Sequence, residues 1–178
     1  MRSQWVCGLE LGHVLAALTA PNRLVCEVCL ATGLRIGDVL NLKTAQLRHK
    51  RFTIKEQKTG KSRLVYLPKD LHDRLLRWAG RVWVFEGRLS AKKHRTRQAV
   101  FKDLRRAAKA FRITAHVTPH SLRKVYAVEY FQRSGCNLEK VRKLLNHSSE
   151  AVTMIYAMAD RLKLPKKGPY KLPKNRRA

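Results

Sequence analysis

The spacing of apolar residues limits this chain to a mainly helical fold with one pair of strands. Most of the sequence shows the spacing of amphipathic helices, in segments 9–18, 21–32, 36–42, 69–79, 96–111, 119–134, 138–145 and 149–158. Residues 51–57 and 62–67 instead alternate or carry β-branched residues, and Lys58-Thr59-Gly60-Lys61 supplies a turn between them. We therefore expect an α+β fold, mainly α-helical with a small antiparallel hairpin or sheet.

Local signals mark the ends and faces of several of these helices. Pro21 suits the first turn of the second helix, and Gly33 suits the left-handed position that follows its last turn. The apolar side of the helix at 69–79 is predicted to hold Leu71, Leu75, Leu76 and Trp78. The helix at 96–111 is predicted to be basic outside and to turn inward Val100, Leu104, Ala107, Ala108 and Phe111.

Length and composition indicate one domain followed by a tail. A chain of 178 residues with 44% hydrophobic residues is long enough to bury a core of its own. We expect residues 1–160 to form this domain. Residues 161–178 hold eight basic residues, three prolines and no acid, so we expect a basic tail there.

The net charge predicts a polyanionic partner. Lys and Arg number 39 against 12 Asp and Glu, which gives +27, and residues 88–112 alone hold ten basic residues and one acid. Phosphates neutralised by such residues release counterions, which favours binding to nucleic acid. The sequence has no run of 18 apolar residues and no clear signal-peptide cleavage site, so we expect a cytoplasmic protein without a membrane partner. By composition alone, a basic RNA-binding protein would fit equally well.

The cysteines do not predict a metal site. Cys26 and Cys29 form a C-x-x-C pair, but they lie in the apolar stretch of a helix, where residues three apart share a buried face. No second pair completes the four ligands of a structural zinc site. The sequence also lacks a Walker-type glycine loop and a carboxylate cluster for Mg²⁺. We expect buried, reduced thiols and no metal or other cofactor.

Polar residues at helix ends are the candidates for chemistry. His120 and Arg123 lie one turn apart at the start of a predicted helix, and Asp38 follows Arg35 by three residues. Taken singly, each has an ordinary structural explanation. A histidine at a helix start commonly caps or packs, and Tyr156 beside apolar residues commonly fills a core.

The order and spacing of these residues resemble the tyrosine recombinases, the phage integrase family, over about residues 10–160. The matching pieces are Ala31-Thr32-Gly33-Leu34-Arg35-Ile36-Gly37-Asp38, Lys58-Thr59-Gly60-Lys61-Ser62-Arg63, His120-Ser121-Leu122-Arg123, Leu145-Asn146-His147 and Tyr156. The resemblance implies the catalytic-domain fold of that family. It also implies a site-specific DNA recombinase or integrase encoded by a bacterium, a phage or a mobile element.

The resemblance assigns three residues to the phosphate and one to its support. Arg35 and Arg123 would hold the phosphate oxygens that gain negative charge in the transition state, with His147 as a further donor. Asp38 would orient or neutralise these cations. Such a clamp does the work that a metal ion would otherwise do.

The remaining residues would form the new bond and transfer protons. Tyr156 would attack the phosphorus, His120 would be its base, and Lys58 would protonate the departing 5′ oxygen as general acid. The product would be a 3′-phosphotyrosine link and a free 5′-hydroxyl. Because the link retains the energy of the broken bond, a 5′-hydroxyl can rejoin the strand without ATP.

The expected partner is double-stranded DNA. The side chains predicted to contact it are Lys61, Arg63, Lys92, Lys93, Arg95 and Arg97. Since recombination joins two duplexes, we expect a homotetramer on DNA, a monomer in isolation and a role for accessory proteins. Asn146 replaces the glycine usual in the family before the second histidine. Because only 34 residues precede Arg35, the N-terminal core-binding domain of typical members is expected to be absent, so the chain is either a catalytic fragment or similar to the compact members of the family.

Two alternatives remain, a module of the same fold and an enzyme with the same chemistry. One is a catalytically inactive or accessory module that only holds DNA, and the other is a type IB topoisomerase that cuts one strand and reseals it. The predicted hairpin and the nine-residue spacing of His147 and Tyr156 resemble the recombinases more closely than the topoisomerases.

Overall fold

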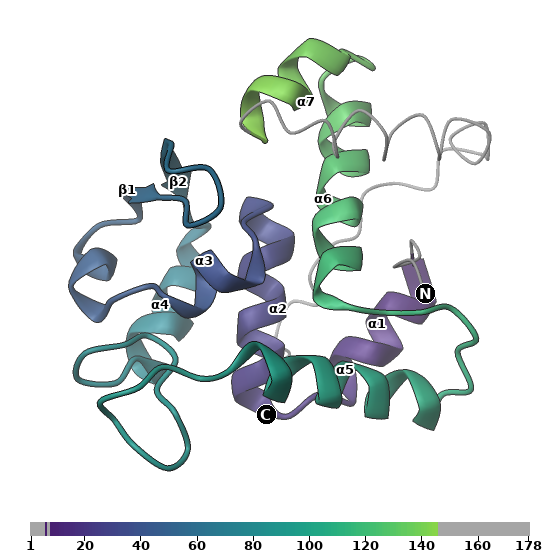
Figure 1. The fold of residues 1–178 in the computed structure, drawn as a ribbon. Coiled ribbons are helices and arrows are strands. Elements are labelled where there is room, and N and C mark those ends of the chain that lie inside the picture. The colour runs from purple at the N-terminus through teal and green to yellow at the C-terminus, as the bar shows by residue number, and fades with distance from the viewer. Residues whose placement is uncertain (1–5, 7, 146–178) are drawn as a thin grey trace.

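The computed structural model describes Val6 and residues 8–145, and these form a mainly helical fold around one antiparallel strand pair (Figure 1). The elements are α1 (Gly8–Ala16), α2 (Ala20–Thr32), α3 (Ile36–Leu40), the 3-10 helix η1 (Thr44–Arg48), β1 (Arg51–Lys55), β2 (Ser62–Tyr66), α4 (Lys69–Trp78), α5 (Arg97–Ala110), α6 (Pro119–Arg133) and α7 (Leu138–Leu144). The predicted fold class is confirmed. The predicted helix at 149–158 and the basic tail lie outside the described residues.

Helix α2 is the centre of the fold. It packs against α6, α3, α4, α5 and α1, and Figure 1 shows α6 standing beside it while α5 crosses below. Val25, Cys26, Val28 and Cys29 are fully buried on it. Burial raises the pKa of the Cys29 thiol to about 12, against the opposing influence of Arg123. The two cysteines are free thiols in the core, as predicted.

The turn after α2 needs glycine for two reasons. Gly33 has φ of 65°, in the left-handed region, and its N–H donates to the carbonyl of Cys29 at 2.8 Å. A Cβ at this position would lie 2.2 Å from the ring of Tyr126 on α6. Position 33 therefore requires glycine, because a side chain there would need the space that the Tyr126 ring occupies.

The hairpin pairs β1 and β2 in the register Arg51↔Tyr66 to Lys55↔Ser62. Ile54 and Val65 are buried, while Lys58 in the connecting turn is exposed. The amide of Gly60 donates to the carbonyl of Glu56 at 2.8 Å, which closes the turn. This arrangement puts Lys58 at the tip of the hairpin, as the sequence predicts.

Three predicted core residues are exposed. Leu76 and Trp78 are 48% and 42% exposed because α4 packs through Leu71 and Leu75, which lie one turn apart. Phe111 is 45% exposed and stacks on the ring of His13 at 4.9 Å between centroids. Leu76 lies about 100° around α4 from Leu75, off the buried stripe, while Trp78 is the last residue of α4 and Phe111 directly follows α5.

Candidate active site

An open cavity of about 420 Å³ lies where the α2–α3 junction, the hairpin turn and the first turns of α5 and α6 meet. Its lining residues are Arg35, Ile36, Gly37, Asp38, Gln57, Lys58, Arg97, Pro119, His120 and Arg123. The structure thus brings together every predicted catalytic or supporting residue that it describes. His147 and Tyr156 lie outside the described residues.

Arg35 enters the cavity as the residue that directly precedes α3. Its side chain is 16% exposed, and its Nη1 donates to Oε2 of Glu56 at 2.9 Å. A guanidinium held at one nitrogen retains donors on its other edge. Arg35 is therefore fixed in place and can still bind an anion in the cavity.

Arg123 reaches the same cavity from α6 and is almost fully buried, at 1% exposed. Its Nη1 donates to the carbonyl of Gly33, and its Nη2 lies 3.4 Å from the carbonyl of Leu145. Thr118 and Ser121 cap the start of α6 reciprocally, which sets the helix axis. His120, in the first turn of that helix, is exposed and lines the cavity.

Asp38 ties α3 to the hairpin. Its carboxylate is 5% exposed, and Oδ1 accepts from the amide of Gln57 at 2.9 Å. Among the described residues, Oδ2 has no hydrogen-bond partner. Burial raises the pKa of this carboxyl, with Glu56 adding to the effect, despite the Gln57 amide and the nearby Arg35 and Arg123. The supporting role of Asp38 toward the cations of the site stays a prediction.

Glu56 is a site residue that the sequence analysis did not identify. It is fully buried, accepts from Arg35 and from the hydroxyl of Thr59, and lies 3.5 Å from Arg63. A signal was present, because Glu56 is the one acid between Asp38 and Asp70 and it directly precedes the turn that carries Lys58. Only the fold shows that this acid faces Arg35.

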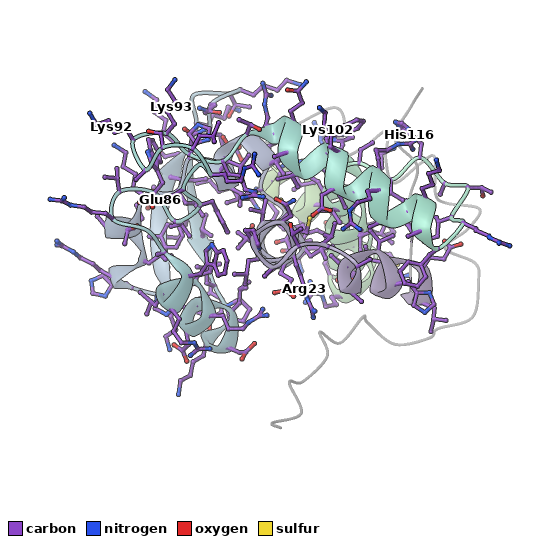
Figure 2. All side chains as sticks on the ribbon, turned by 90° about the horizontal axis from the view of Figure 1, so that it is seen from below. Arg23, Glu86, Lys92, Lys93, Lys102 and His116 are labelled. Atoms are coloured by element: carbon purple, nitrogen blue, oxygen red, sulfur yellow. The ribbon has the colours of Figure 1, made fainter. Side chains whose placement is uncertain are left out.

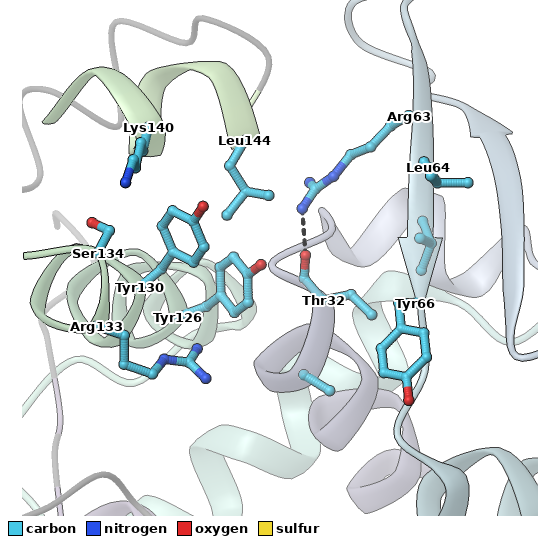
Figure 3. Close-up of a pocket in the computed structure, with 12 residues that line it drawn as sticks. Thr32, Arg63, Leu64, Tyr66, Tyr126, Tyr130, Arg133, Ser134, Lys140 and Leu144 are labelled. Carbon is cyan, nitrogen blue, oxygen red and sulfur yellow. Dashed lines mark hydrogen bonds between the residues drawn. The ribbon is translucent and has the colours of Figure 1, made fainter. Parts of the chain in front are cut away.

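The prediction that Arg63 contacts DNA does not agree with its placement. Its side chain points from β2 to the end of α2 and donates to the carbonyl of Thr32 (Figure 3). It also donates to the carbonyl of Gly33 at 3.5 Å. It is 8% exposed, since the buried carboxylate of Glu56 requires cations around it. Arg63 also lines a second cleft, of about 470 Å³, between β2, α2, α6 and α7.

The other side chains predicted to contact DNA differ in exposure. Lys61, Lys92, Lys93 and Arg97 are exposed, and Figure 2 shows Lys92 and Lys93 pointing outward on the same side of the molecule as Lys102 of α5. Arg95 is only partly exposed and donates to Oδ1 of Asn22 at 2.5 Å, and burial lowers its pKa. Arg95 therefore has a structural role that the sequence analysis did not anticipate.

The cavity has the chemistry of an anion site. Arginine side chains enter it from three elements together with a lysine and a histidine, and the described acids beside it are Asp38 and Glu56. Among Val6 and residues 8–145, no three His, Cys, Asp or Glu side chains cluster in a way that could hold a metal ion. In the same residues, no helix is long and apolar enough to cross a bilayer.

Comparison with known proteins gives consistent matches. The sequence model of the phage integrase family matches residues 10–162. The tyrosine recombinase XerD of Mycobacterium tuberculosis is 33% identical over 158 residues, which cover 79% of this chain and 49% of the relative. The integrase of Escherichia phage P2 is 28% identical over 148 residues, covering 83% and 41%. The chain thus spans about half the length of the curated relatives it matches.

Solved structures share the fold. The catalytic domain of bacteriophage HP1 integrase superposes with a TM-score of 0.63 at 23% identity, over 96% of this chain and 100% of that one. A lambda integrase dimer bound to a COC′ core site gives a TM-score of 0.73 at 20% identity, over 96% and 51%. With the family model matching most of its length, the chain belongs to the phage integrase family.

Proposed function

We propose that this chain is the catalytic domain of a site-specific tyrosine recombinase that cuts and rejoins double-stranded DNA. One observation carries the proposal. Arg35, Lys58, His120 and Arg123 come from three separated segments of the chain and line one cavity. Arg35, Lys58 and Arg123 are the cations that a phosphoryl-transfer site without a metal ion requires, His120 adds a base, and the family resemblance selects the same residues.

The cavity suits the charge that develops on the reacting phosphate. In the transition state, negative charge spreads over the non-bridging oxygens of the phosphorus. Arg35 and Arg123 bring permanently charged, forked donors to one point from different elements, and both are already held by hydrogen bonds. Because these donors need little reorganisation, they stabilise the transition state more than they stabilise the bound DNA.

Cleavage makes one bond to phosphorus and breaks one. The phenolic oxygen of Tyr156 forms a bond to phosphorus as the bond from phosphorus to the 5′ oxygen breaks. His120 receives the proton of the phenol, Lys58 gives a proton to the 5′ oxygen, and His147 donates to the phosphate. In reverse, a 5′-hydroxyl from the same or another strand attacks the phosphotyrosine and releases Tyr156. The domain boundaries at residues 160 and 161 and the role of each residue are part of this proposal.

The proposed partners are DNA and further copies of the chain. A solved relative is a lambda integrase tetramer bound to a Holliday junction, at 20% identity and a TM-score of 0.70. The formal charge of +27 and the exposed Lys92 and Lys93 supply electrostatic attraction to the backbone. We propose a homotetramer on two duplexes as the active assembly.

Covalent capture from a pool of random duplexes tests the proposal and selects the DNA target in the same step. The chain is incubated with nicked duplexes of random central sequence, and DNA that remains attached to protein in SDS is sequenced. We expect an adduct on an enriched sequence, and we expect Tyr156→Phe to abolish the adduct while leaving the gel shift unchanged.

Each alternative function predicts a different result in the same experiment. An adduct that persists in Tyr156→Phe contradicts the assignment of the nucleophile. DNA binding without any adduct in the unchanged chain indicates an inactive binding module. Adducts without sequence enrichment, together with relaxation of supercoiled plasmid, indicate a topoisomerase.

A further inference from the structure

Glu56 occupies an unusual position for an acid in this basic chain. It directly follows β1 and stands two residues before Lys58, and its side chain is completely buried. A buried carboxylate costs free energy unless cations or donors surround it. The contacts of Glu56 therefore show which parts of the structure depend on it.

Those contacts join three parts of the site. Oε2 accepts from Nη1 of Arg35 at 2.9 Å and from the hydroxyl of Thr59 at 3.0 Å, and Oε1 lies 3.5 Å from Nη1 of Arg63. Arg35 precedes α3, Thr59 lies in the hairpin turn and Arg63 lies on β2. Oε2 of Glu56 thus binds both Arg35, a proposed phosphate ligand, and Thr59, the residue next to the proposed general acid.

Thr59 is the link from this carboxylate to the tip of the hairpin. Its hydroxyl donates to Glu56 and lies 3.3 Å from the amide of Lys61, as an acceptor. The backbone also closes the turn, from the Glu56 amide to the carbonyl of Lys61 at 3.0 Å. Lys58 and Gly60 are exposed while Thr59 between them is partly buried, so the Thr59 side chain connects an exposed turn to the buried carboxylate.

We propose that Glu56 is a positioning residue that places two catalytic cations together, Arg35 by direct contact and Lys58 through Thr59. The inference rests on the proposed function and extends it to residues that do not touch the DNA. Releasing the turn by Thr59→Val lets Lys58 leave its place while Arg35 keeps its partner. Thr59→Val should therefore slow protonation of the departing 5′ oxygen, because that is the step assigned to Lys58.

A sulfur-substituted substrate separates this role from general damage. When sulfur replaces the bridging 5′ oxygen, the leaving group is a thiolate, which needs no general acid because a thiol is far more acidic than an alcohol. Single-turnover adduct formation is measured with oxygen and sulfur substrates of the captured sequence. The variants are Thr59→Val, Lys58→Ala, Glu56→Gln and the control Thr53→Val, which makes the same chemical change at an exposed position on β1.

With the oxygen substrate, we expect Thr59→Val to be about 10- to 100-fold slower than the unchanged chain, the range for misplacing a catalytic group by about 1 Å. With sulfur, Thr59→Val and Lys58→Ala should approach the unchanged rate. Glu56→Gln should stay slower on sulfur, because Arg35 has also lost its charged partner. Thr53→Val should match the unchanged chain on both substrates.

Two results overturn the inference. One is an unchanged oxygen rate in Thr59→Val, and the other is an equal defect of Thr59→Val on oxygen and sulfur. Failure of the proposed function is distinguishable, because it appears as absence of an adduct in the unchanged chain.

Amide hydrogen exchange tests the anchoring without DNA. Exchange at residues 58–62 should be at least about tenfold faster in Thr59→Val than in Thr53→Val, since the anchored turn opens more often when its link is removed. Equal exchange in the two variants overturns the proposed anchoring whether or not an adduct forms.

Discussion

Arg123 donates a hydrogen bond to the carbonyl oxygen of Gly33, a residue ninety positions earlier in the chain. The same carbonyl lies 3.5 Å from Nη1 of Arg63. The turn between α2 and α3 is therefore attached to α6 on one side and to the hairpin on the other. Since Arg35 follows Gly33 by two residues, the placement of both proposed phosphate ligands depends on this turn.

Gly33→Ala should destabilise the domain by about 3 kcal/mol or more, for two reasons. An alanine is strained in the left-handed region, and its side chain would clash with the Tyr126 ring. Gly135→Ala is the matched control, since Gly135 has φ of 72° and an added Cβ would meet no atom within 4 Å. It should cost only about 1–2 kcal/mol. Urea unfolding of both variants measures the difference. Equal losses would show that Tyr126 moves aside without cost.

Asp38→Asn should stabilise the chain at pH 8 while impairing adduct formation. Burial raises the pKa of the Asp38 carboxyl, so the folded state holds this proton more tightly than the unfolded state. The unchanged chain therefore loses stability as the pH rises through the folded pKa, and the asparagine variant does not. The advantage of Asp38→Asn should shrink as the pH falls from 8 to 4.

Urea midpoints across that pH range test the Asp38 prediction. Asp70→Asn serves as the control, because the Asp70 side chain is 81% exposed and its removal should change the midpoint little at any pH. A lower midpoint of Asp38→Asn at pH 8 would mean that the arginines stabilise this carboxylate more than burial destabilises it.

Asp103→Asn should destabilise the domain at neutral pH and lose its effect in acid. Burial alone would raise the pKa of Asp103, but hydrogen bonds from Asn22, Thr19 and Arg106 outweigh it and lower the pKa to about 2. The stabilisation is complete above the unfolded pKa of about 3.9 and is lost as the pH falls through the folded value.

The expected loss in Asp103→Asn at pH 7 is about 1–2 kcal/mol, because Thr19 and Arg106 are exposed and water screens part of the interaction. Thermal or urea unfolding at pH 7, 4 and 2 measures it. A loss that stays constant down to pH 2 would show that Asp103 stabilises the fold through packing and uncharged hydrogen bonds, and not through its negative charge.

Lys92→Ala combined with Lys93→Ala should weaken DNA binding through the backbone. Both lysines are exposed on the side of the molecule that also carries Lys102 (Figure 2). Each lost phosphate contact reduces the slope of log K against log salt by about 0.9, so the double variant should lower it by about 1.8. Fluorescence anisotropy with a random-sequence duplex between low and moderate salt measures the slope.

Lys69→Ala combined with Arg77→Ala is the control for the lysine pair. It removes two exposed cations from α4 and should leave the slope nearly unchanged. Equal slopes for the two double variants would mean that the total charge, rather than this surface, holds the DNA.

Features that depend on near neighbours could be predicted from the sequence. The helical spacing, the hairpin turn at Lys58–Lys61, the left-handed Gly33 and the buried Cys26 and Cys29 all follow from residues within one or two turns of each other. The family motifs also selected Arg35, Lys58, His120 and Arg123, and these do line one cavity. Local hydrogen bonding and side-chain periodicity are sufficient to predict the helices, the turn and the buried cysteines, whereas the four site residues were selected only by the resemblance to the family.

The tertiary structure alone decided what the charges near the site do. Arg63 alternates in phase with Val65 and Leu67 on the buried face of the hairpin, yet its charge favoured an exposed phosphate contact. It is buried because Glu56 is also buried, and Glu56 is stable there because Arg35 approaches from 21 residues away. A buried charge is tolerated only beside a partner of opposite sign, and only the folded chain brings that partner to it.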